Sequence, residues 1–193
     1  MKWELPATKV SYKLPEILSK NEVQQIIKAT GNIKHRTLLM LIYSAGLRVS
    51  EATCLQCKDV DSERMTLHIR GCKNRKDRYV ILSPKILIAL RDYWKATRFE
   101  NHVFPGQKAG QPISAATASA IYKKAKAIAG VKKAGGIHGL RHAYSTHLLE
   151  AGEDIFVISK LLGHTSIHST VRYLQFVPGK NTTVFSPIET LEL

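Results

Sequence analysis

The sequence has 193 residues and a mass of 21.6 kDa, a length that suits one domain with a core of its own. Its 44% hydrophobic and 23% charged residues are ordinary for a globular protein and exclude a collagen-like or disordered chain. The 29 Lys and Arg against 15 Asp and Glu leave a net charge of +14, which predicts a polyanionic partner, with nucleic acid ahead of an anionic membrane surface.

An extended lead-in is expected over the first 18 residues, followed by three helices. Ser19 and Glu22 have the spacing of a capping box, in which each side chain binds a free backbone amide at a helix start. Gly31 and Gly46 are expected to end the first and second helices, and the second is apolar enough to lie in the core. The expected ranges are Ser19 to Ala29 or Thr30, Ile33–Ala45 and Ser50–Cys57.

The hydrophobic periodicity then changes from helix to strand. Thr66–Arg70 and Arg78–Leu82 are β-prone runs on either side of a basic loop, Gly71–Asp77, which predicts a hairpin. Ser83 followed by Pro84 predicts a helix start, because proline suits the first helical position. The remaining expected helices are Pro84 to about Thr97, Ser114–Gly130, His138–Ala151, Asp154–Leu162 and Ser166–Leu174.

These elements predict an α+β fold that is mostly helical, with a small antiparallel β-hairpin. The longest apolar run, Leu38–Tyr43, is too short to cross a bilayer. Met1–Val10 lacks the apolar segment of a secretory signal. We therefore expect a cytoplasmic protein.

Three cysteines, Cys54, Cys57 and Cys72, do not suit a disulfide framework and are typical of the cytosol. Cys54 and Cys57 form a C-x-x-C inside an expected helix, without a second pair to complete a zinc site. Two histidine pairs have the i, i+4 spacing that can chelate zinc: His138 with His142, and His164 with His168. Neither pair encloses the Glu of H-E-x-x-H, and Arg141 would repel a cation, so we predict no metal.

A set of six side chains would suit attack on a phosphodiester if the fold brings them together. Guanidinium groups bind phosphate oxygens in pairs, and a tyrosine oxygen can be a covalent nucleophile. Taken singly, each residue is more often a surface charge or a satisfied core residue. The set is Arg48, a lysine of the hairpin, His138, Arg141, His164 and Tyr173. No G-x-S-x-G motif supports a serine hydrolase instead.

The order of these motifs resembles a known family. They are Gly46-Leu47-Arg48-Val49-Ser50-Glu51, the hairpin lysine, His138-x-x-Arg141-His142, Leu161-Leu162-Gly163-His164, and Tyr173. The series resembles the catalytic domain of tyrosine recombinases of the Xer/phage-integrase type, over about residues 14–177. The resemblance implies site-specific DNA strand exchange, in integration, excision or inversion, through a 3′-phosphotyrosyl intermediate and without a metal or nucleotide cofactor.

The resemblance also assigns roles to single residues. Tyr173 matches the nucleophile, and Arg48 and Arg141 match the arginines that clamp the scissile phosphate. His138 matches the residue that accepts the tyrosine proton or positions the phosphate, and His164 matches a hydrogen-bond donor to a non-bridging oxygen. Glu51 resembles the acidic residue that supports this cluster from behind.

The hairpin and one helix are expected to contact DNA. Aligning Asp77–Leu82 with the second hairpin strand of the family places the general-acid lysine at Lys73, with Lys76 and Arg75 as rivals. The Ala- and Lys-rich helix Ser114–Gly130 is a candidate for the major groove, where most lysine contacts go to phosphate. The expected DNA-binding residues are Arg75, Lys76, Lys123, Lys124 and Lys126.

The expected organisation is a lead-in or linker over 1–18, the recombinase catalytic domain over 19–177 and a tail over 178–193. Members of the family usually have an N-terminal helical domain that closes a clamp around DNA. Either this sequence is a piece cut at the linker, or the recombinase is naturally minimal. The expected partner is double-stranded DNA, with a homotetramer in the synaptic complex and a monomer or weak oligomer otherwise.

Three other functions agree less well with the sequence. A type IB topoisomerase uses similar chemistry, but the Leu-Leu-Gly-His motif and the small size favour a recombinase. A DNA-binding regulator with a decayed active site would not keep the whole set of residues. A membrane-surface protein is disfavoured because no amphipathic anchor stands out.

The tail differs from the rest in charge. Asn181–Leu193 contains two Glu and no Lys or Arg, so it is not expected to lie on DNA. Ser186, Pro187 and Glu189 form a second capping box, which predicts a helix of about two turns that needs a docking partner. We expect it to pack on a neighbouring protomer of the synapse; a frayed end or one folded back on its own domain is the alternative.

Overall fold

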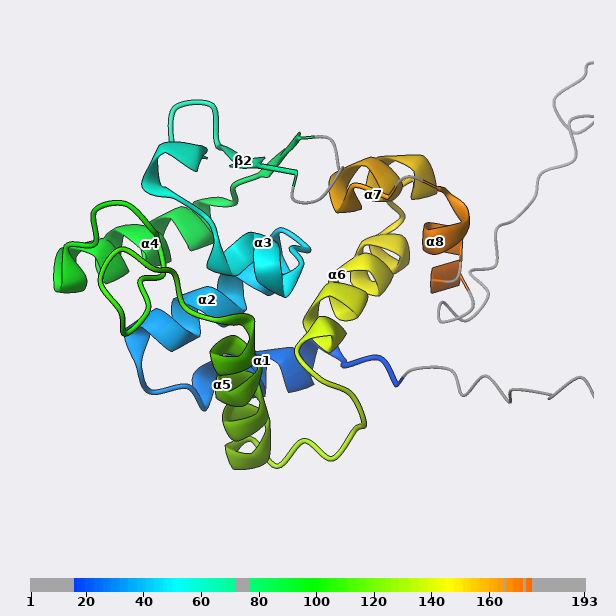
Figure 1. Cartoon of the computed structure of the whole chain (residues 1–193). Coiled ribbons are helices and arrows are strands. Elements are labelled where there is room, and N and C mark those ends of the chain that lie inside the picture. The colour runs from blue at the N-terminus through cyan, green and yellow to red at the C-terminus, as the bar shows by residue number, and fades with distance from the viewer. Residues whose placement is uncertain (1–15, 72–76, 165, 172, 175–193) are drawn as a thin grey trace, which may run out of the picture.

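The computed structural model describes residues 16–71, 77–164, 166–171, 173 and 174 (Figure 1). In this part of the chain it contains eight α-helices, one short 3₁₀-helix and one three-stranded antiparallel sheet, which confirms the mostly helical α+β fold. In chain order the elements are α1 (Lys20–Lys28), α2 (Ile33–Ser44), α3 (Val49–Thr53), η1 (Cys57–Asp59), β1 (Val60–Asp61), β2 (Thr66–Ile69), β3 (Arg78–Ile81), α4 (Pro84–Thr97), α5 (Ala115–Ile128), α6 (His138–Ala151), α7 (Ile155–Leu162) and α8 (His168–Val171).

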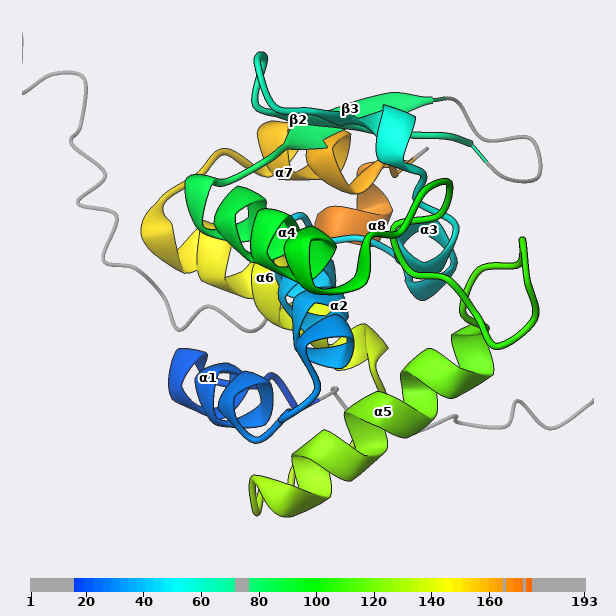
Figure 2. The ribbon, with the colours of Figure 1, turned by 90° about the vertical axis from the view of Figure 1, so that its left-hand side faces the viewer.

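Helix α2 is the centre of the molecule. It packs against α1, α3, α4, α5 and α6, and it lies in the middle of the fold in both views (Figures 1 and 2). Leu38, Leu39, Leu41 and Ile42 have no exposed surface. Leu38, Leu41 and Ile42 share one face of the helix and Leu39 lies beside it, so α2 is buried over a broad face, as its apolar run predicts.

The expected helix caps are present. The Ser19 backbone amide donates to Glu22 Oε2 at 2.7 Å, and the Glu22 amide donates to Ser19 Oγ at 3.2 Å, so α1 starts with the predicted capping box. The Ser83 side chain caps α4, and Pro84 stands in its first turn. These starts are local features, and the sequence pattern alone was sufficient to find them.

The sheet has the order β1-β2-β3 and packs beside α7. β2 and β3 form the expected hairpin, with Thr66 opposite Ile81 and Ile69 opposite Arg78. Strand β1 was not expected; it pairs Val60 with Leu67 over two residues, too few to show an alternating pattern.

Two expected helices are shorter than predicted. α3 ends at Thr53, so Cys54 and Cys57 do not share a helix, and that expectation is wrong. The cause is tertiary: the backbone at 55–57 pairs with a distant segment, since the Val103 amide donates to Leu55 O and the Cys57 amide to Asn101 O. Of the helix expected over Ser166–Leu174, the structure describes His168–Val171 as α-helical.

The described residues form two apolar clusters. The larger cluster joins α1 to α5 with the sheet and the start of α6. The smaller one lies between α6 and α7, and its buried members are Leu149, Ile158, Leu162 and Tyr173. None of the described helices has both the length and the hydropathy to cross a membrane.

Candidate active site

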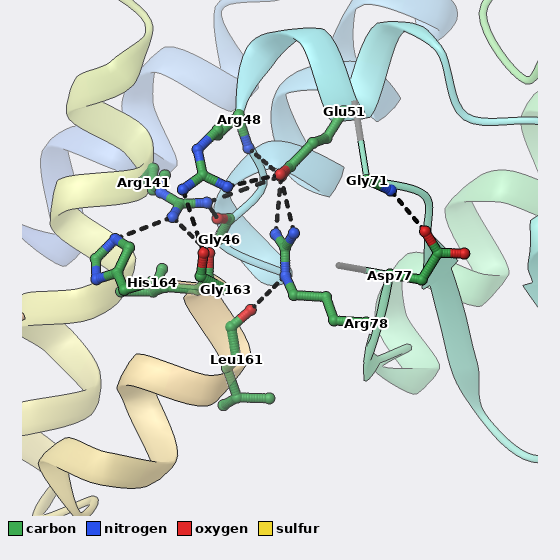
Figure 3. A network of polar contacts seen from close by, with 11 residues as sticks. Gly46, Arg48, Glu51, Gly71, Asp77, Arg78, Arg141, Leu161, Gly163 and His164 are labelled. Carbon is green, nitrogen blue, oxygen red and sulfur yellow. Dashed lines mark hydrogen bonds and ion pairs between the residues drawn. The ribbon is translucent and has the colours of Figure 1, made fainter. Parts of the chain in front are cut away.

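Arg141 joins the C-terminal ends of two helices. It lies on α6 and is buried, with Nη1 donating to Gly46 O and Nη2 to Leu162 O, each at 2.7 Å (Figure 3). These carbonyls follow α2 and end α7, where free carbonyl groups favour a cation. Burial, together with repulsion from Arg48, lowers the pKa of Arg141 to about 10, so it stays protonated at neutral pH.

Gly46 is required for this arrangement. Its φ of +59° lies in the left-handed region, and a Cβ atom there would come within 2.4 Å of the Tyr144 ring. The glycine therefore lets the chain turn sharply after α2 and pass close to α6. The next residues, Leu47 and Arg48, enter α3 from this turn.

Glu51 is the anion around which the arginines gather. Its side chain accepts from Arg48 Nη1 at 2.8 Å and lies 3.8 Å from Arg141 Nη1 (Figure 3). Burial alone would raise the pKa of this carboxyl, but hydrogen bonds from the Arg78 side chain and the Arg48 backbone hold it at about 2. Glu51 is therefore ionised throughout the neutral range.

Arg78 was not among the candidate site residues. It makes a two-pronged contact with Glu51, at 2.9 and 2.8 Å, and its Nε donates to Leu161 O at 2.9 Å. A Cβ atom on Gly163 would come within 2.8 Å of the Arg78 side chain, so the glycine leaves room for it. The sequence did contain a signal, because Arg78 shares the inward face of β3 with the buried Val80.

Arg48 is more accessible than Arg141. It is the residue before α3, and its side chain is 20% exposed while that of Arg141 is 6% exposed. Its Nη2 group contacts Gly163 O at 3.5 Å, which places the guanidinium beside the end of α7 (Figure 3). Part of Arg48 thus faces solvent, where a phosphate could approach.

His164 lies two residues after the end of α7 and contacts the same cluster. Its Nε2 atom is 3.2 Å from Arg141 Nη2, and its Nδ1 atom is 2.7 Å from Thr170 Oγ1. A guanidinium has only donors, so Nε2 accepts and Nδ1–H donates to the buried Thr170. Thr170 is a further contact that the sequence did not single out.

Tyr173 lies in the smaller apolar cluster and is 3% exposed. Its hydroxyl is 3.0 Å from Nδ1 of His142, the residue after Arg141 on α6. His138, the other histidine of the motif, is exposed at the first residue of α6. The fold thus brings Tyr173 to His142.

The remaining predicted residues have different positions. Lys73, Arg75 and Lys76, as well as the tail with Ser186–Leu193, lie outside the described residues. On α5, Lys123 and Lys124 are exposed, whereas the Lys126 ammonium donates to Lys133 O and, at 3.3 Å, to Gly135 O. Lys126 therefore holds the segment that follows α5.

The groups weighed as zinc ligands do not gather. Within the described ranges, no three His, Cys, Asp or Glu side chains could hold a metal ion together. Cys54, which follows α3, is exposed, and Cys57, the first residue of η1, is half-buried. His142 and His164 take part in the contacts given above.

Comparison with known proteins places the chain in a family. It matches the model of the phage integrase family over residues 16–178. It is 44% identical over 187 residues to "Putative integrase/recombinase y4qK" of Sinorhizobium fredii, covering 97% of this chain and 61% of that protein. It is 35% identical over 174 residues to the tyrosine recombinase XerA of Pyrococcus horikoshii, covering 88% of this chain and 60% of that protein.

A solved structure supports the same assignment. The crystal structure of XerA recombinase superposes with a TM-score of 0.77 at 26% identity, covering 88% of this chain and 62% of that one. This chain thus spans about three fifths of the length of these relatives. The chain belongs to the phage integrase family, the family of tyrosine recombinases that its motifs resemble.

Proposed function

We propose that this chain breaks and rejoins DNA strands as a site-specific recombinase, with Tyr173 as the nucleophile. The observation that carries the proposal is the convergence of Arg48, Arg141 and His164, from three separate elements, in one network. Tyr173 adds a hydroxyl that contacts the residue next to Arg141. Membership of the family supports the same chemistry.

The proposed step is an in-line displacement at phosphorus. Tyr173 Oη forms a bond to the scissile phosphorus, and the bond from phosphorus to the 5′-oxygen breaks. Negative charge grows on the non-bridging oxygens in the transition state, where Arg48 and Arg141 would stabilise it. His164 would donate to one of these oxygens only in its protonated form, with Nε2–H turned from Arg141 to the phosphate while Nδ1–H stays on Thr170. Glu51 and Arg78 would keep the guanidinium groups in position before DNA arrives.

The leaving 5′-oxygen needs a proton, for which we propose Lys73, with Lys76 or Arg75 as rivals. The ends of their loop are held together at the base of the hairpin, where Asp77 Oδ1 accepts from the Gly71 amide at 2.8 Å (Figure 3). His138, exposed at the start of α6, would position the phosphate. We propose no cofactor, because one phosphodiester replaces another and no external energy source is needed.

Double-stranded DNA is the proposed substrate, and the net charge of +14 supports a polyanion. The exposed Lys123 and Lys124 make α5 the proposed DNA-facing helix. Strand exchange between two duplexes requires four cleavages, so we propose a homotetramer in the synapse. We also propose a cytoplasmic location, where the DNA substrate would be found. The proposed DNA-binding residues are Arg75, Lys76, Lys123, Lys124 and Lys126, of which Lys126 also donates to Lys133 O within the chain.

Nicked duplexes with randomised sequence around the nick test the proposal. Cleavage near a nick releases a short strand, so a covalent protein–DNA adduct accumulates and can be sequenced. The chain is expected to form adducts, and Tyr173→Phe is expected to bind DNA without forming them. The control, Tyr79→Phe, changes an exposed tyrosine of β3 and should keep adduct formation.

Two results would contradict the proposal. Adducts formed by Tyr173→Phe would move the nucleophile elsewhere, with Tyr144 or Tyr79 as the next candidates. DNA binding by the unaltered chain without any adduct would favour a regulator that has lost catalysis.

A further inference from the structure

We propose that His142 accepts the proton of the Tyr173 hydroxyl during cleavage and returns it during ligation. This inference rests on the proposed function and deepens it. The resemblance to the family left His138 as the candidate for this proton. The contacts of the described residues favour the histidine one turn further along α6.

The first argument is direct contact with the nucleophilic atom. Tyr173 Oη and His142 Nδ1 are 3.0 Å apart, and the two rings lie 5.7 Å apart at an angle of 49°. A nucleophile within hydrogen-bond reach of a base is the geometry that activates hydroxyl groups in covalent catalysis. A phenol needs such a base because its ordinary pKa is about 10.

The second argument is the surroundings of the hydroxyl. Tyr173 is 3% exposed and packs among Leu149, Ile158 and Leu162. Bulk water therefore has little access to the ring, and a fixed side chain must take the proton. The Arg141 guanidinium interacts electrostatically with Tyr173 and would stabilise the phenolate as the proton leaves.

The third argument separates the two histidines of the motif. Four residues along a helix correspond to a rise of about 6 Å, so His138 and His142 cannot occupy the same place. His138 is exposed at the first residue of α6, where an incoming phosphate can meet it. His142 is half-buried and faces Tyr173. We assign the proton to His142 and the phosphate to His138.

The proposed step balances in atoms and charge. Neutral His142 carries its proton on Nε2 and accepts the phenolic proton at Nδ1 as the bond from Oη to phosphorus forms. The bond from phosphorus to the 5′-oxygen breaks, and the general acid of the hairpin protonates that oxygen. In ligation a 5′-hydroxyl attacks phosphorus and gives its proton back to the hairpin base, while Nδ1–H of His142 protonates the departing Tyr173 oxygen.

The chain contains a matched control pair on the same helix. Tyr43 Oη lies 2.8 Å from His147 Nδ1, five residues after His142 on α6, and the rings meet edge to face. The contact has the same chemistry, but it does not involve Tyr173. His147→Asn therefore removes an equivalent imidazole without touching the proposed nucleophile.

The experiment compares two single-turnover reactions in the full chain. The first is adduct formation on the trapped nicked duplex. The second is ligation of a strand that ends in a 3′-p-nitrophenyl phosphate, which replaces the tyrosyl phosphodiester. The p-nitrophenolate leaves without a proton, so this ligation needs the phosphate-binding residues but neither Tyr173 nor its base.

His142→Asn is expected to slow adduct formation by about 10²–10⁴-fold, the usual effect of losing a positioned base, while ligation of the p-nitrophenyl end changes only a few-fold. His147→Asn is expected to leave the ratio of the two rates unchanged. That ratio does not depend on the fraction of folded protein, so a loss of stability cannot imitate the effect.

Three results would overturn the inference. His142→Asn could form adducts at the unaltered rate, or it could lose both reactions to the same extent, which would indicate a role at the phosphate. Alternatively, His138→Asn, and not His142→Asn, could slow adduct formation while leaving ligation of the p-nitrophenyl end nearly unchanged. If the unaltered chain ligates the p-nitrophenyl end but never forms an adduct, the result contradicts the proposed function itself, because Tyr173 is then not a nucleophile.

Discussion

Glu51 shows how one buried carboxylate organises several cations. Arg48 and Arg78 donate to it, and Arg141 lies 3.8 Å away. Like charges so close together repel, and without the anion they would separate or lose their fixed positions. The guanidinium groups proposed to bind phosphate are thus held in place by a residue that has no need to touch DNA.

Arg78→Lys tests whether this support affects catalysis. Lysine keeps the charge but not the two-pronged contact, so adduct formation should fall by about 10–100-fold through misplaced arginines. The measurement is the single-turnover cleavage rate with saturating nicked DNA. The matched control is Arg70→Lys, at the residue after β2, which breaks a contact of two guanidinium nitrogens with one oxygen of the buried Asp59 in η1. If the cleavage rate falls equally in both variants, Arg78 supports the fold in general and does not specifically position the arginines.

The pKa of Glu51 makes stability depend on pH. The folded value of about 2 lies below the unfolded one, so the contribution is fully present above about pH 4.5 and is lost as pH falls toward 2. A shift of this size corresponds to about 3 kcal/mol of unfolding free energy. Thermal unfolding of Glu51→Gln should show lower stability at neutral pH and a shallower fall between about pH 5 and pH 2 than the unaltered chain. Glu63→Gln, at an exposed site, should match the unaltered curve.

At the scale of elements, the β2–β3 hairpin connects the sheet to the site. Arg78 in β3 holds the hairpin against Glu51 and against the end of α7. Asp77 links the two strands through the Gly71 amide and through His68 Nε2 at 2.9 Å. The loop that carries the proposed general acid therefore begins and ends on a fixed base.

The hairpin lysines can be distinguished by the leaving group. Lys73→Ala should slow cleavage by about 10²–10⁴-fold, because the 5′-oxygen then leaves without a proton. A substrate with sulfur at the 5′-bridging position should restore the rate, since a thiolate needs no proton. Rescue of Lys76→Ala, but not of Lys73→Ala, would show that the alignment of the hairpin is wrong by three residues.

At the scale of the whole molecule, the net charge of +14 predicts how DNA binding responds to salt. Contacts with about six phosphates would release counterions, so affinity should fall about 10³-fold or more between about 50 and 200 mM salt. Fluorescence anisotropy with a labelled duplex measures the slope. A flat response would contradict binding through phosphate contacts.

The tail tests assembly. Deleting Ser186–Leu193, which lies outside the described residues, should leave binding to a single duplex intact and weaken synapsis if the tail docks on a neighbouring protomer. Native gel shifts with two labelled duplexes would follow both properties. A truncated chain that assembles and recombines like the intact one would show that the tail has no such role.

Local interactions explain what could be predicted from the sequence. The capping box of Ser19, the proline that starts α4 and the alternation of the hairpin strands each depend on neighbouring residues, so their patterns were sufficient. The order of the arginine, histidine and tyrosine motifs was also sufficient to identify the family, which the family model confirms.

Only the tertiary structure decided which side chains meet. Arg78 and Glu51 are 27 residues apart, and Tyr173 and His142 are 31 residues apart. The early end of α3 depends on Asn101 and Val103, far along the chain. Such pairings have no local signature, because they arise from how α2, the hairpin and α7 pack. The sequence by itself therefore determined the fold class and the candidate residues, while packing determined that the proposed nucleophile contacts His142 and that Arg78 shares Glu51 with Arg48, one of the arginines proposed to bind phosphate.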